Sequence, residues 1–301
     1  MAQESQLVET LAVIGVGLIG GSLAGALKEG GTVGCVVGCG RNIDNLEMAL
    51  QHGLIDRYTR DPLEAVSEAD LVLLATPVNA LIQSLPTLAK HARPNAVITD
   101  AGSVKSEVIR AARSALGETF GRFVPGHPIA GREKSGADAA VTDLFRDRWV
   151  VLTPLAETDP TAIELVKQMW EQVGARIRLM DPESHDEILG MTSHLPHAVA
   201  YALVAQLADQ PRNEEYASMT AGGFLDITRV ASSDPAMWRD IFLHNAKPTA
   251  NLIREHRKVL ERLEGLIREG DAQGLQEWFD SAKALRSSLE DTRNHQRSKV
   301  R

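Results

Sequence analysis

Two patterns of apolar residues divide the chain near residue 180. Up to that point short, β-branched apolar runs alternate with segments of helical spacing, and after it only the helical spacing continues. The runs lie at 11–16, 35–40, 71–76, 96–102, 122–126, 149–153 and 176–180. Several are apolar at nearly every position, which is typical of parallel strands covered on both faces. The pattern predicts βαβ units and an α/β fold with a doubly wound sheet.

The second part of the chain is predicted to be all helical. A long apolar helix should begin after Asp181, its N-cap residue, with Pro182 in the first turn and a kink at Pro196. Two later segments, 252–267 and 275–289, carry apolar residues at helical spacing. We therefore expect two domains, 1–180 and 181–301, and the first helix of the second domain is typical of a core or a subunit interface.

Composition and charge narrow the functional class. The 301 residues are 44% hydrophobic and 24% charged, as in soluble globular proteins of about two domains. A net charge of −8 argues against a nucleic-acid-binding protein. The two cysteines, Cys35 and Cys39, lie in one apolar run, which is typical of core residues in a reducing cytosol. The N-terminal segment has no basic stretch before its apolar residues, so we expect a cytoplasmic protein without a membrane anchor.

A glycine-rich turn follows the first apolar run and opens a helical segment. Gly15, Gly17 and Gly20 form a GxGxxG pattern that encloses Leu18 and Ile19. In dinucleotide-binding folds these glycines permit a tight turn, close approach to a pyrophosphate and close helix–strand packing. The amides of the helix N-terminus attract the phosphates. The turn predicts a Rossmann-type dinucleotide-binding domain over 1–180, with a turn that binds no ligand as the alternative.

The end of the second predicted strand bears on the choice of cofactor. NAD sites usually place Asp or Glu about 20 residues after the glycine-rich turn, whereas this chain has the sequence CGRN at 39–42. Arg41 can pair with a 2′-phosphate as a planar fork, which favours NADP. If Arg41 is solvated or stacks on the adenine, NAD is the cofactor. Thr76 and Pro77, at the end of another predicted strand, should lie along the same edge of the sheet.

A histidine directly follows the fifth apolar run. His127 stands between Gly126 and Pro128, on what we expect to be a rigid turn. With an ordinary pKa near 6.5, an imidazole can accept a proton at neutral pH. A single histidine is more often structural, but this one falls where the carboxyl edge of the sheet should meet a nicotinamide. We therefore predict a catalytic role for His127.

Two histidines and an arginine stand out in the helical part. His194 and His197 are three residues apart and share a helix face. With no carboxylate or cysteine to complete the set, we expect no metal site there. Arg229 follows the paired glycines at 222–223, on a predicted loop, and can clamp a carboxylate bidentately. The alternative is an arginine that ties the loop to a helix end.

These motifs occur together, in the same order, in one known family. Over about residues 10–240 the segments GVGLIGGS, DAGSVK, GHPIAGREKSG, SHLPH, GGFLDITRVA and SDPAMW resemble the prephenate/arogenate (cyclohexadienyl) dehydrogenase family. The resemblance implies a Rossmann-type domain followed by a helical dimerisation domain, in a homodimer. It also implies the NAD(P)-dependent oxidative decarboxylation of prephenate to 4-hydroxyphenylpyruvate, of arogenate to tyrosine, or of both, in tyrosine biosynthesis.

The resemblance further implies roles for individual residues. His127 matches the catalytic histidine that hydrogen-bonds the ring hydroxyl, and Ser103 matches the serine that orients this histidine near the nicotinamide. Arg229 matches the arginine that holds the ring carboxylate, and Trp238 matches a tryptophan from the partner subunit. Other residues expected to lie near the substrate or to gate it are His194, His197, Gly222, Asp226 and Glu133.

Some points are left open by the sequence. The chain ends at Arg301, without a regulatory amino-acid-binding domain or a fused chorismate mutase, so any inhibition by tyrosine should act at the active site. If His197 donates to a pyruvyl group, prephenate or dual use is favoured over strict arogenate specificity.

Two alternative functions remain. A 3-hydroxyacid or imine dehydrogenase would share this plan but should show a catalytic lysine motif in the helical part. A non-catalytic NADP-sensing protein has no reason to keep His127, Ser103 and Arg229 together.

Overall fold

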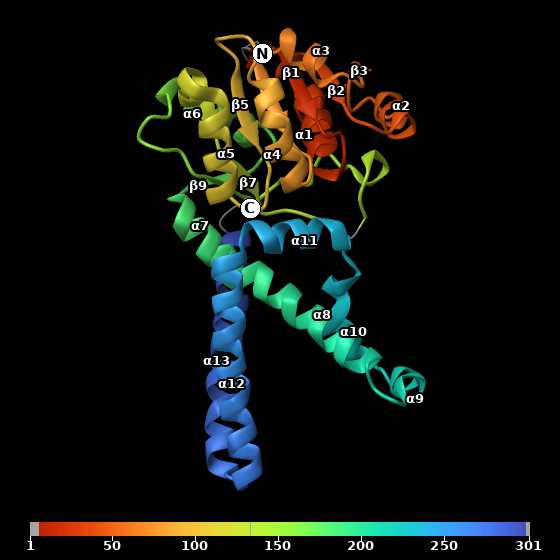
Figure 1. Ribbon diagram of the computed structural model, residues 1–301, viewed down its shortest axis with the longest axis vertical. Helices are drawn as coiled ribbons and strands as arrows, with labels where there is room; N and C mark the ends of the chain where they lie inside the picture. The colour runs from red at the N-terminus through yellow and green to blue at the C-terminus, as the bar shows by residue number, and fades with distance from the viewer. Residues whose placement is uncertain (1–5, 133, 299–301) are drawn as a thin grey trace. The chain divides into compact units, whose positions relative to one another are not determined.

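The structure, a computed structural model, describes residues 6–132 and 134–298 of the chain. Its strands are β1 (Val8–Ile14), β2 (Val33–Cys39), β3 (Arg57–Thr59), β4 (Leu71–Leu74), β5 (Val97–Asp100), β6 (Phe123–Val124), β7 (Gly126–Pro128), β8 (Trp149–Leu152) and β9 (Arg176–Leu179). Its α-helices are α1 (Leu18–Glu29), α2 (Ile43–Gln51), α3 (Pro62–Ser67), α4 (Val78–Leu88), α5 (Ser106–Leu116), α6 (Pro160–Gln172), α7 (Pro182–Leu189), α8 (Leu195–Ala208), α9 (Asn213–Ser218), α10 (Gly222–Thr228), α11 (Pro235–His244), α12 (Ala246–Glu269) and α13 (Ala272–Ser298) (Figure 1).

The chain forms two compact units, Met1–Ala246 and Lys247–Arg301. The first unit contains every strand and the helices from α1 to α11 of the described chain, and the second contains α13 and nearly all of α12. The units divide well after residue 180, the predicted domain boundary. The reason is that α7 packs against α5 and α11 packs against α4, so the first helices of the helical part join the nucleotide-binding part.

The strands form two sheets. The larger sheet is entirely parallel, in the order β3-β2-β1-β4-β5-β6, which confirms the predicted Rossmann-type arrangement. The smaller sheet has the order β7-β8-β9, with β7 antiparallel to β8 and β8 parallel to β9. The apolar runs at 149–153 and 176–180 therefore lie in a second sheet rather than in one continuous sheet. The short strands β3 and β7 were not predicted because three residues carry too little periodicity.

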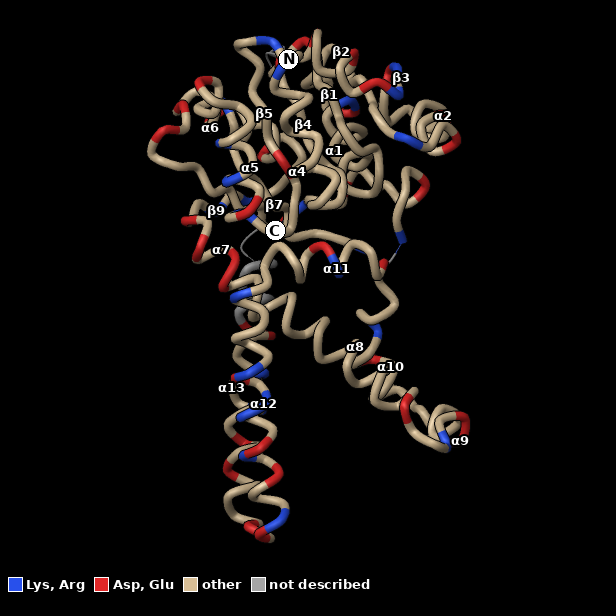
Figure 2. Tube along the Cα trace, in the orientation of Figure 1, with Lys and Arg blue, Asp and Glu red and all other residues tan. Residues whose placement is uncertain are grey.

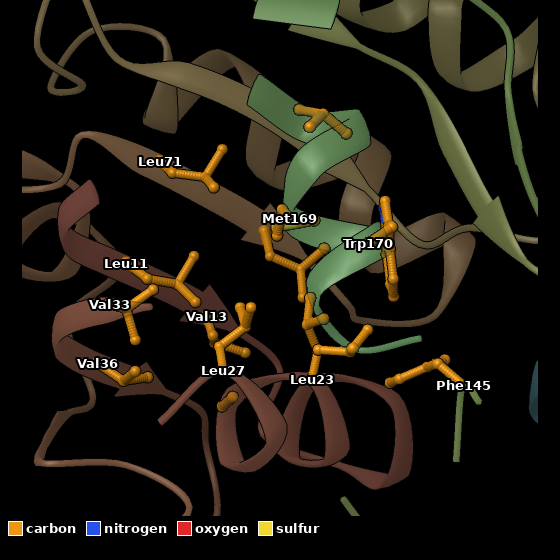
Figure 3. Packing of buried hydrophobic residues seen from close by; sticks show 14 of the residues in the cluster. Leu11, Val13, Leu23, Leu27, Val33, Val36, Leu71, Phe145, Met169 and Trp170 are labelled. Atoms are coloured by element: carbon orange, nitrogen blue, oxygen red, sulfur yellow. The ribbon is translucent and has the colours of Figure 1, made fainter. Parts of the chain in front are cut away.

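Successive residues of the central strand β1 point to opposite faces, and both faces are covered. Leu11 and Val13 pack in one buried cluster with Leu23 and Leu27 of α1 (Figure 3). Ala12 and Ile14 pack in a second cluster, on the side of α3, α4, α5 and α11. Burial on both faces explains why this strand is a continuous apolar run instead of an alternating one.

The first helix of the helical part starts as predicted but is interrupted. Asp181 caps α7, because its carboxylate accepts a hydrogen bond of 2.8 Å from the amide of Ser184. One π-helical turn, Gly190–His194, separates α7 from α8, and Pro196 lies in the first turn of α8. The expected break is thus a π turn just before the proline, which can then occupy a position where its missing N–H is tolerated.

The stretch Pro182–Ala208 is long and apolar enough, by length and composition alone, to cross a membrane. Its most apolar window has a mean hydropathy of 1.2 and is 28% buried within the chain. The α8 part has no charged residue, whereas α12 and α13 carry charges of both signs along their length (Figure 2). The same stretch contains three buried residues that form side-chain hydrogen bonds, His185, Asp186 and His194.

Candidate active site

The turn between β1 and α1 contains three glycines, and the structure constrains each of them differently. Gly15 has a φ of +105°, and a Cβ there would lie 2.7 Å from the carbonyl of Ala75. A Cβ on Gly20 would overlap the carbonyl oxygen of Gly15. A Cβ on Gly17, in contrast, meets no atom of the described residues within 4 Å. Gly15 and Gly20 are thus required by the turn itself, whereas Gly17 leaves open space in front of the helix.

The open space lies at the N-terminus of α1. Gly17 is the N-cap residue and has no side chain to cap the helix, so the amides of Leu18 and Ile19 in the first turn face outward. Thr76 and Pro77 follow β4, the neighbour of β1, and Pro77 is the N-cap of α4. A dinucleotide pyrophosphate fits this arrangement because unsatisfied amides and the helix dipole favour an anion there. We call these residues the glycine cradle.

The end of β2 is more acidic than the sequence suggests. Arg41 is exposed, directly before Asn42, which caps α2. Cys39, at the end of β2, has its pKa raised to about 11 by burial and, secondarily, by the negative charges of Asp61 and Glu64. These carboxylates come from the β3–α3 region beside β2. They follow β3 and not β2, where the acidic residue that binds the ribose of NAD is normally found, so the sequence did not point to them.

His127 lies in β7, a strand and not the predicted turn. Its backbone pairs with Val151 of β8, and its side chain is half-buried. The strand is fixed at Gly126, whose amide donates to a carboxylate oxygen of Asp100 at 3.1 Å and whose carbonyl accepts from Nζ of Lys105 at 2.6 Å. Lys105 and Asp100 also form an ion pair with both side chains fully buried. The loop after β5 therefore holds the histidine's strand in place.

The ring of His127 contacts a second histidine that the sequence analysis missed. Nδ1 of His127 lies 2.9 Å from Nε2 of His185, and Nδ1 of His185 lies 2.9 Å from Oδ1 of Asp186. His185 is fully buried and Asp186 is 3% exposed. The sequence His185-Asp186 on α7 carried no motif, and only the packing of α7 on α5 brings it to the site.

Asp186 is held as a carboxylate at the start of α5. Its Oδ1 accepts from the amide of Lys105 and its Oδ2 from the amide of Ser106, both at 2.8 Å. Burial alone would raise its pKa, but the hydrogen bonds from His185, Ser106 and Lys105 outweigh burial and lower the pKa below its ordinary value. The group is therefore ionised at neutral pH, where the N-terminus of a helix also favours it.

The histidines around Asp186 are neutral at pH 7. Burial lowers the pKa of His127 well below 6.5, and electrostatic repulsion between its cation and His185, Lys105 and His194 lowers it further. Burial also lowers the pKa of His185, against the opposing hydrogen bond from Asp186. The pKa of His194 falls to about 4, again mainly through burial. A neutral imidazole keeps one bare nitrogen, as a general base requires.

His194 and His197 lie at the junction of the π turn and α8. Nδ2 of Asn245 donates to Nδ1 of His194 at 2.9 Å and to the carbonyl of Asp186 at 2.9 Å. Nδ1 of His197 donates to the carbonyl of Ser193 at 2.9 Å, which leaves Nε2 of neutral His197 as an acceptor. The sequence did not predict a role for Asn245, which lies at the end of α11 and links it to α7 through these hydrogen bonds.

Trp238 packs against a histidine of its own chain. Its ring stacks on His197 of its own chain, with 3.5 Å between ring centroids and an interplanar angle of 22°. It is 6% exposed, and its Nε1 donor has no hydrogen-bond partner among the described residues. Trp238 thus lies beside His197 of its own chain, and its expected contribution to a partner subunit stays a prediction.

The remaining predicted residues divide into two groups. Arg229 begins a short 3-10 helix, Arg229–Ser232, instead of a loop, and its positive charge helps to lower the pKa of His197, after burial. Ser103 is half-buried in the loop before α5. Gly222 at the start of α10 and Asp226 within it are exposed. Glu133 lies outside the described residues.

Comparison with known proteins identifies the family of the chain. Residues 23–179 match the model of the prephenate dehydrogenase nucleotide-binding domain, and 181–281 match that of the prephenate dehydrogenase dimerization domain. A prephenate dehydrogenase of Bacillus subtilis (strain 168) is 37% identical over 95% of this chain and 77% of its own length. A cyclohexadienyl dehydrogenase of Zymomonas mobilis is 38% identical over 93% of this chain and 95% of its own length.

Solved structures show the same similarity. The prephenate dehydrogenase of A. aeolicus, in complex with hydroxyphenyl propionate and NAD+, superposes with a TM-score of 0.87 at 37% identity, over 93% of this chain and 98% of that one. The arogenate dehydrogenase of Synechocystis has a TM-score of 0.78 at 29% identity, over 93% of this chain and 99% of that one.

The fold and the site define a nicotinamide-dependent oxidoreductase with a Rossmann-type domain and a helical part. Within that class, the chain belongs to the prephenate dehydrogenase family, as two family models and relatives of 37–38% identity show. This result favours the principal sequence interpretation over the 3-hydroxyacid, imine and sensor alternatives.

Proposed function

We propose that the protein catalyses the NAD(P)-dependent oxidative decarboxylation of prephenate, arogenate or both, a step of tyrosine biosynthesis. The observation that carries the proposal is the neutral imidazole of His127, fixed on β7 beside the loop that ends β5. Parallel α/β sheets bind their cofactors at the carboxyl ends of the strands, so a base at this position faces the nicotinamide end of a bound dinucleotide.

The reaction needs a base, a hydride acceptor and a held carboxylate. The substrate is a cyclohexadiene with a hydroxyl at C4 and a carboxylate at C1. The nicotinamide, when bound, supplies the hydride acceptor. His127 takes the hydroxyl proton as the hydride leaves C4, and the C1–carboxylate bond then breaks to release carbon dioxide, its electron pair completing the aromatic ring. Aromatisation drives the reaction, so the protein mainly supplies orientation and charge placement.

Arg229 is proposed to hold the ring carboxylate and Ser103 to orient His127 and the hydroxyl. An arginine–carboxylate contact contributes mainly to binding, because the carboxylate is present in the ground state. Arg229→Ala should therefore raise the substrate KM about 10–100-fold, the equivalent of about 1.5–3 kcal/mol for a charged hydrogen bond. Steady-state kinetics would measure this, and an unchanged KM would remove Arg229 from the role.

His197 is proposed to contact the side chain that distinguishes the two substrates. Because Nδ1 donates to Ser193, neutral His197 accepts at Nε2, which suits the ammonium of arogenate. Only protonated His197 can donate from Nε2 to the pyruvyl group of prephenate. Burial, with the charge of Arg229, lowers the pKa of His197 and favours the neutral form. In this proposal neutral His197 is an acceptor, the reverse of the sequence expectation that it donates to the pyruvyl group.

Dual use follows, with a preference that depends on pH. The ratio of kcat/KM for arogenate to that for prephenate should rise as pH increases through the His197 titration. The ratio should become independent of pH in His197→Asn. A flat ratio in the unmodified enzyme would contradict the assignment.

For the cofactor, we propose that Arg41 permits NADP to bind, while Asp61 and Glu64 oppose its 2′-phosphate. A two-by-two assay, NAD and NADP with prephenate and arogenate, tests the whole proposal. Turnover of neither substrate with either cofactor would exclude the function. His127→Asn in the same assay distinguishes a base from a bystander.

We also propose a homodimer in the cytoplasm. The matched dimerization model includes α8 and α10, where Val204, Leu225 and Ile227 are exposed. An apolar surface of this kind is typical of a subunit interface. Light scattering should give twice the chain mass, and Leu225→Glu should reduce it toward one chain.

A further inference from the structure

His127 is the outermost member of a hydrogen-bonded series that ends at a helix. The series runs from the amides at the start of α5 to Asp186, then to His185, and then to Nδ1 of His127. Each histidine link is 2.9 Å. The rings of His127 and His185 meet edge to face, with centroids 5.1 Å apart at 61°. No step of the mechanism above uses His185 or Asp186.

The polarity of the series determines where each proton lies. Ionised Asp186 can only accept, so Nδ1 of His185 carries a proton and donates to it. A neutral imidazole with a proton on Nδ1 has a bare Nε2, so His185 must accept from His127. Nδ1 of His127 therefore carries the proton of the neutral ring, and its Nε2 is bare.

Both ends of the series are fixed. Asp186 is immobilised by two amides at its carboxylate and by Asn245 at its carbonyl. His127 is immobilised through Gly126, which contacts the buried Lys105–Asp100 pair. A side chain held in one orientation by buried partners loses no further freedom on reaching its working geometry.

We propose that His185 and Asp186 are positioning residues that fix the tautomer of His127, so that its bare Nε2 faces the substrate hydroxyl. When His127 accepts the hydroxyl proton at Nε2, it becomes a cation whose Nδ1–H still donates to His185. The ionisable groups that face it are His185, Lys105 and His194, which disfavour the cation, whereas the carboxylate of Asp186 acts on it through His185. The proposal rests on the proposed function for its kinetic part only.

Asp186→Asn tests the proposal with little change in shape. Asp186 uses both oxygens, Oδ1 for the amide of Lys105 and for His185, and Oδ2 for the amide of Ser106, so the single oxygen of asparagine can take only one of these positions. With that oxygen at the Ser106 amide, the NH2 group takes the Oδ1 position and donates to Nδ1 of His185. His185 would then carry its proton on Nε2 and donate to His127, whose own proton would move to Nε2 and block the base. We expect kcat to fall about 10²–10⁴-fold, the range for loss of a general base, with the cofactor Kd unchanged.

Two comparisons separate this role from a structural one. His185→Gln can still donate to Asp186 and accept from His127, so it should keep more activity than His185→Leu. Asp240→Asn replaces another buried carboxylate, one that pairs with Arg239 on α11, and should leave kcat unchanged. In Asp186→Asn the residual kcat should rise with pH, as hydroxide replaces the blocked base.

The tautomer can be measured without turnover. Two-bond proton–nitrogen NMR spectra distinguish Nδ1-protonated from Nε2-protonated imidazole. The signals of His127 are assigned as the set that disappears in His127→Asn. We expect an Nδ1-protonated His127 in the unmodified protein and an Nε2-protonated one in Asp186→Asn. Protonation of His127 at Nε2 in the unmodified protein would overturn the proposal. So would a kcat of Asp186→Asn within threefold of the kcat of the unmodified protein. Absence of turnover with both substrates would overturn the function but leave the NMR result standing.

Discussion

The glycine cradle and the histidine series are built in opposite ways. The cradle uses backbone from six consecutive positions, 15–20, together with a neighbouring strand end. The series uses side chains from β7 and α7 that meet at the start of α5. Its hydrogen bonds join His127 to His185 across 58 residues, and Asp186 to the α5 amides across 80 and 81 residues. The cradle depends on glycines because they have no side chain, whereas the series depends on side chains that fix the position of a proton.

The difference predicts how each region responds to change. The cradle contains no titratable side chain, so its substitutions should act through space and cofactor affinity, and the same way at every pH. The histidines and Asp186 form one coupled network, in which each substitution alters protonation of the others. Kinetics measured against pH should therefore separate the two regions cleanly.

The largest effect is expected for His127→Asn. Asparagine keeps a polar group of similar size but cannot act as a base, so kcat should fall about 10²–10⁴-fold. Affinity for the cofactor, measured by fluorescence titration, should change little because the cradle is untouched. His91→Asn, at an exposed histidine on the surface, is the matched control. Turnover close to that of the unmodified protein would remove His127 from catalysis.

The cradle is tested by two glycine-to-alanine substitutions that are expected to have different consequences. Gly17→Ala places its methyl in open space, so the melting temperature should stay the same while the cofactor KM rises about 10–100-fold. Gly20→Ala overlaps the carbonyl of Gly15 and should lower the free energy of unfolding by about 1–3 kcal/mol. Thermal melts with and without cofactor measure both. A pH-dependent defect in Gly17→Ala would break the contrast with the histidines.

A smaller effect concerns stability against pH. His194 has a pKa of about 4 in the fold and 6.5 as an ordinary value, so folding favours its neutral form. This stabilisation is complete above pH 6.5 and is lost as pH falls toward 4, up to about 3 kcal/mol. In denaturant melts, the free energy of unfolding of His194→Asn should fall less over that pH range than that of the unmodified protein. The exposed His52→Asn should melt as the unmodified protein does at each pH, and an equal slope for His194→Asn would contradict the assignment.

The smallest effect is expected at Arg41. This side chain is exposed, so its pairing with a 2′-phosphate is screened by solvent. Arg41→Ala should raise the KM for NADP by up to about tenfold, or about 1.4 kcal/mol, and leave that for NAD nearly unchanged. Equal changes for both cofactors would assign Arg41 to the adenine instead.

Features that depend on neighbouring residues were predictable from the sequence. The cradle was found because Gly15, Gly17 and Gly20 perform their tasks within one turn, and the parallel strands because burial on both faces makes them apolar throughout. The start of α7 followed from Asp181 and Pro182, which act on the adjacent amides. Short elements such as β7 escaped because their pairing partner, and not their composition, makes them strands.

Features that depend on tertiary contacts were not predictable. His185 and Asp186 carry no pattern that distinguishes them from ordinary helix residues, and only the packing of α7 on α5 gives them a role. Asn245 and the Lys105–Asp100 pair are of the same kind. The stacking of Trp238 on His197 likewise depends on a tertiary contact, between α11 and α8.

The π turn at Gly190–His194 gives α7 and α8 separate phases. A residue added to or removed from a helix rotates everything after it by about 100°, and a π turn is such an addition absorbed locally. His185 and Asp186 stand before it, and His197 stands after it. Changing the length of this turn by one residue would therefore re-aim His197 while His185 and Asp186 stayed in place. The turn is thus a natural point for altering the proposed substrate contact of His197 without altering the proposed base, His127.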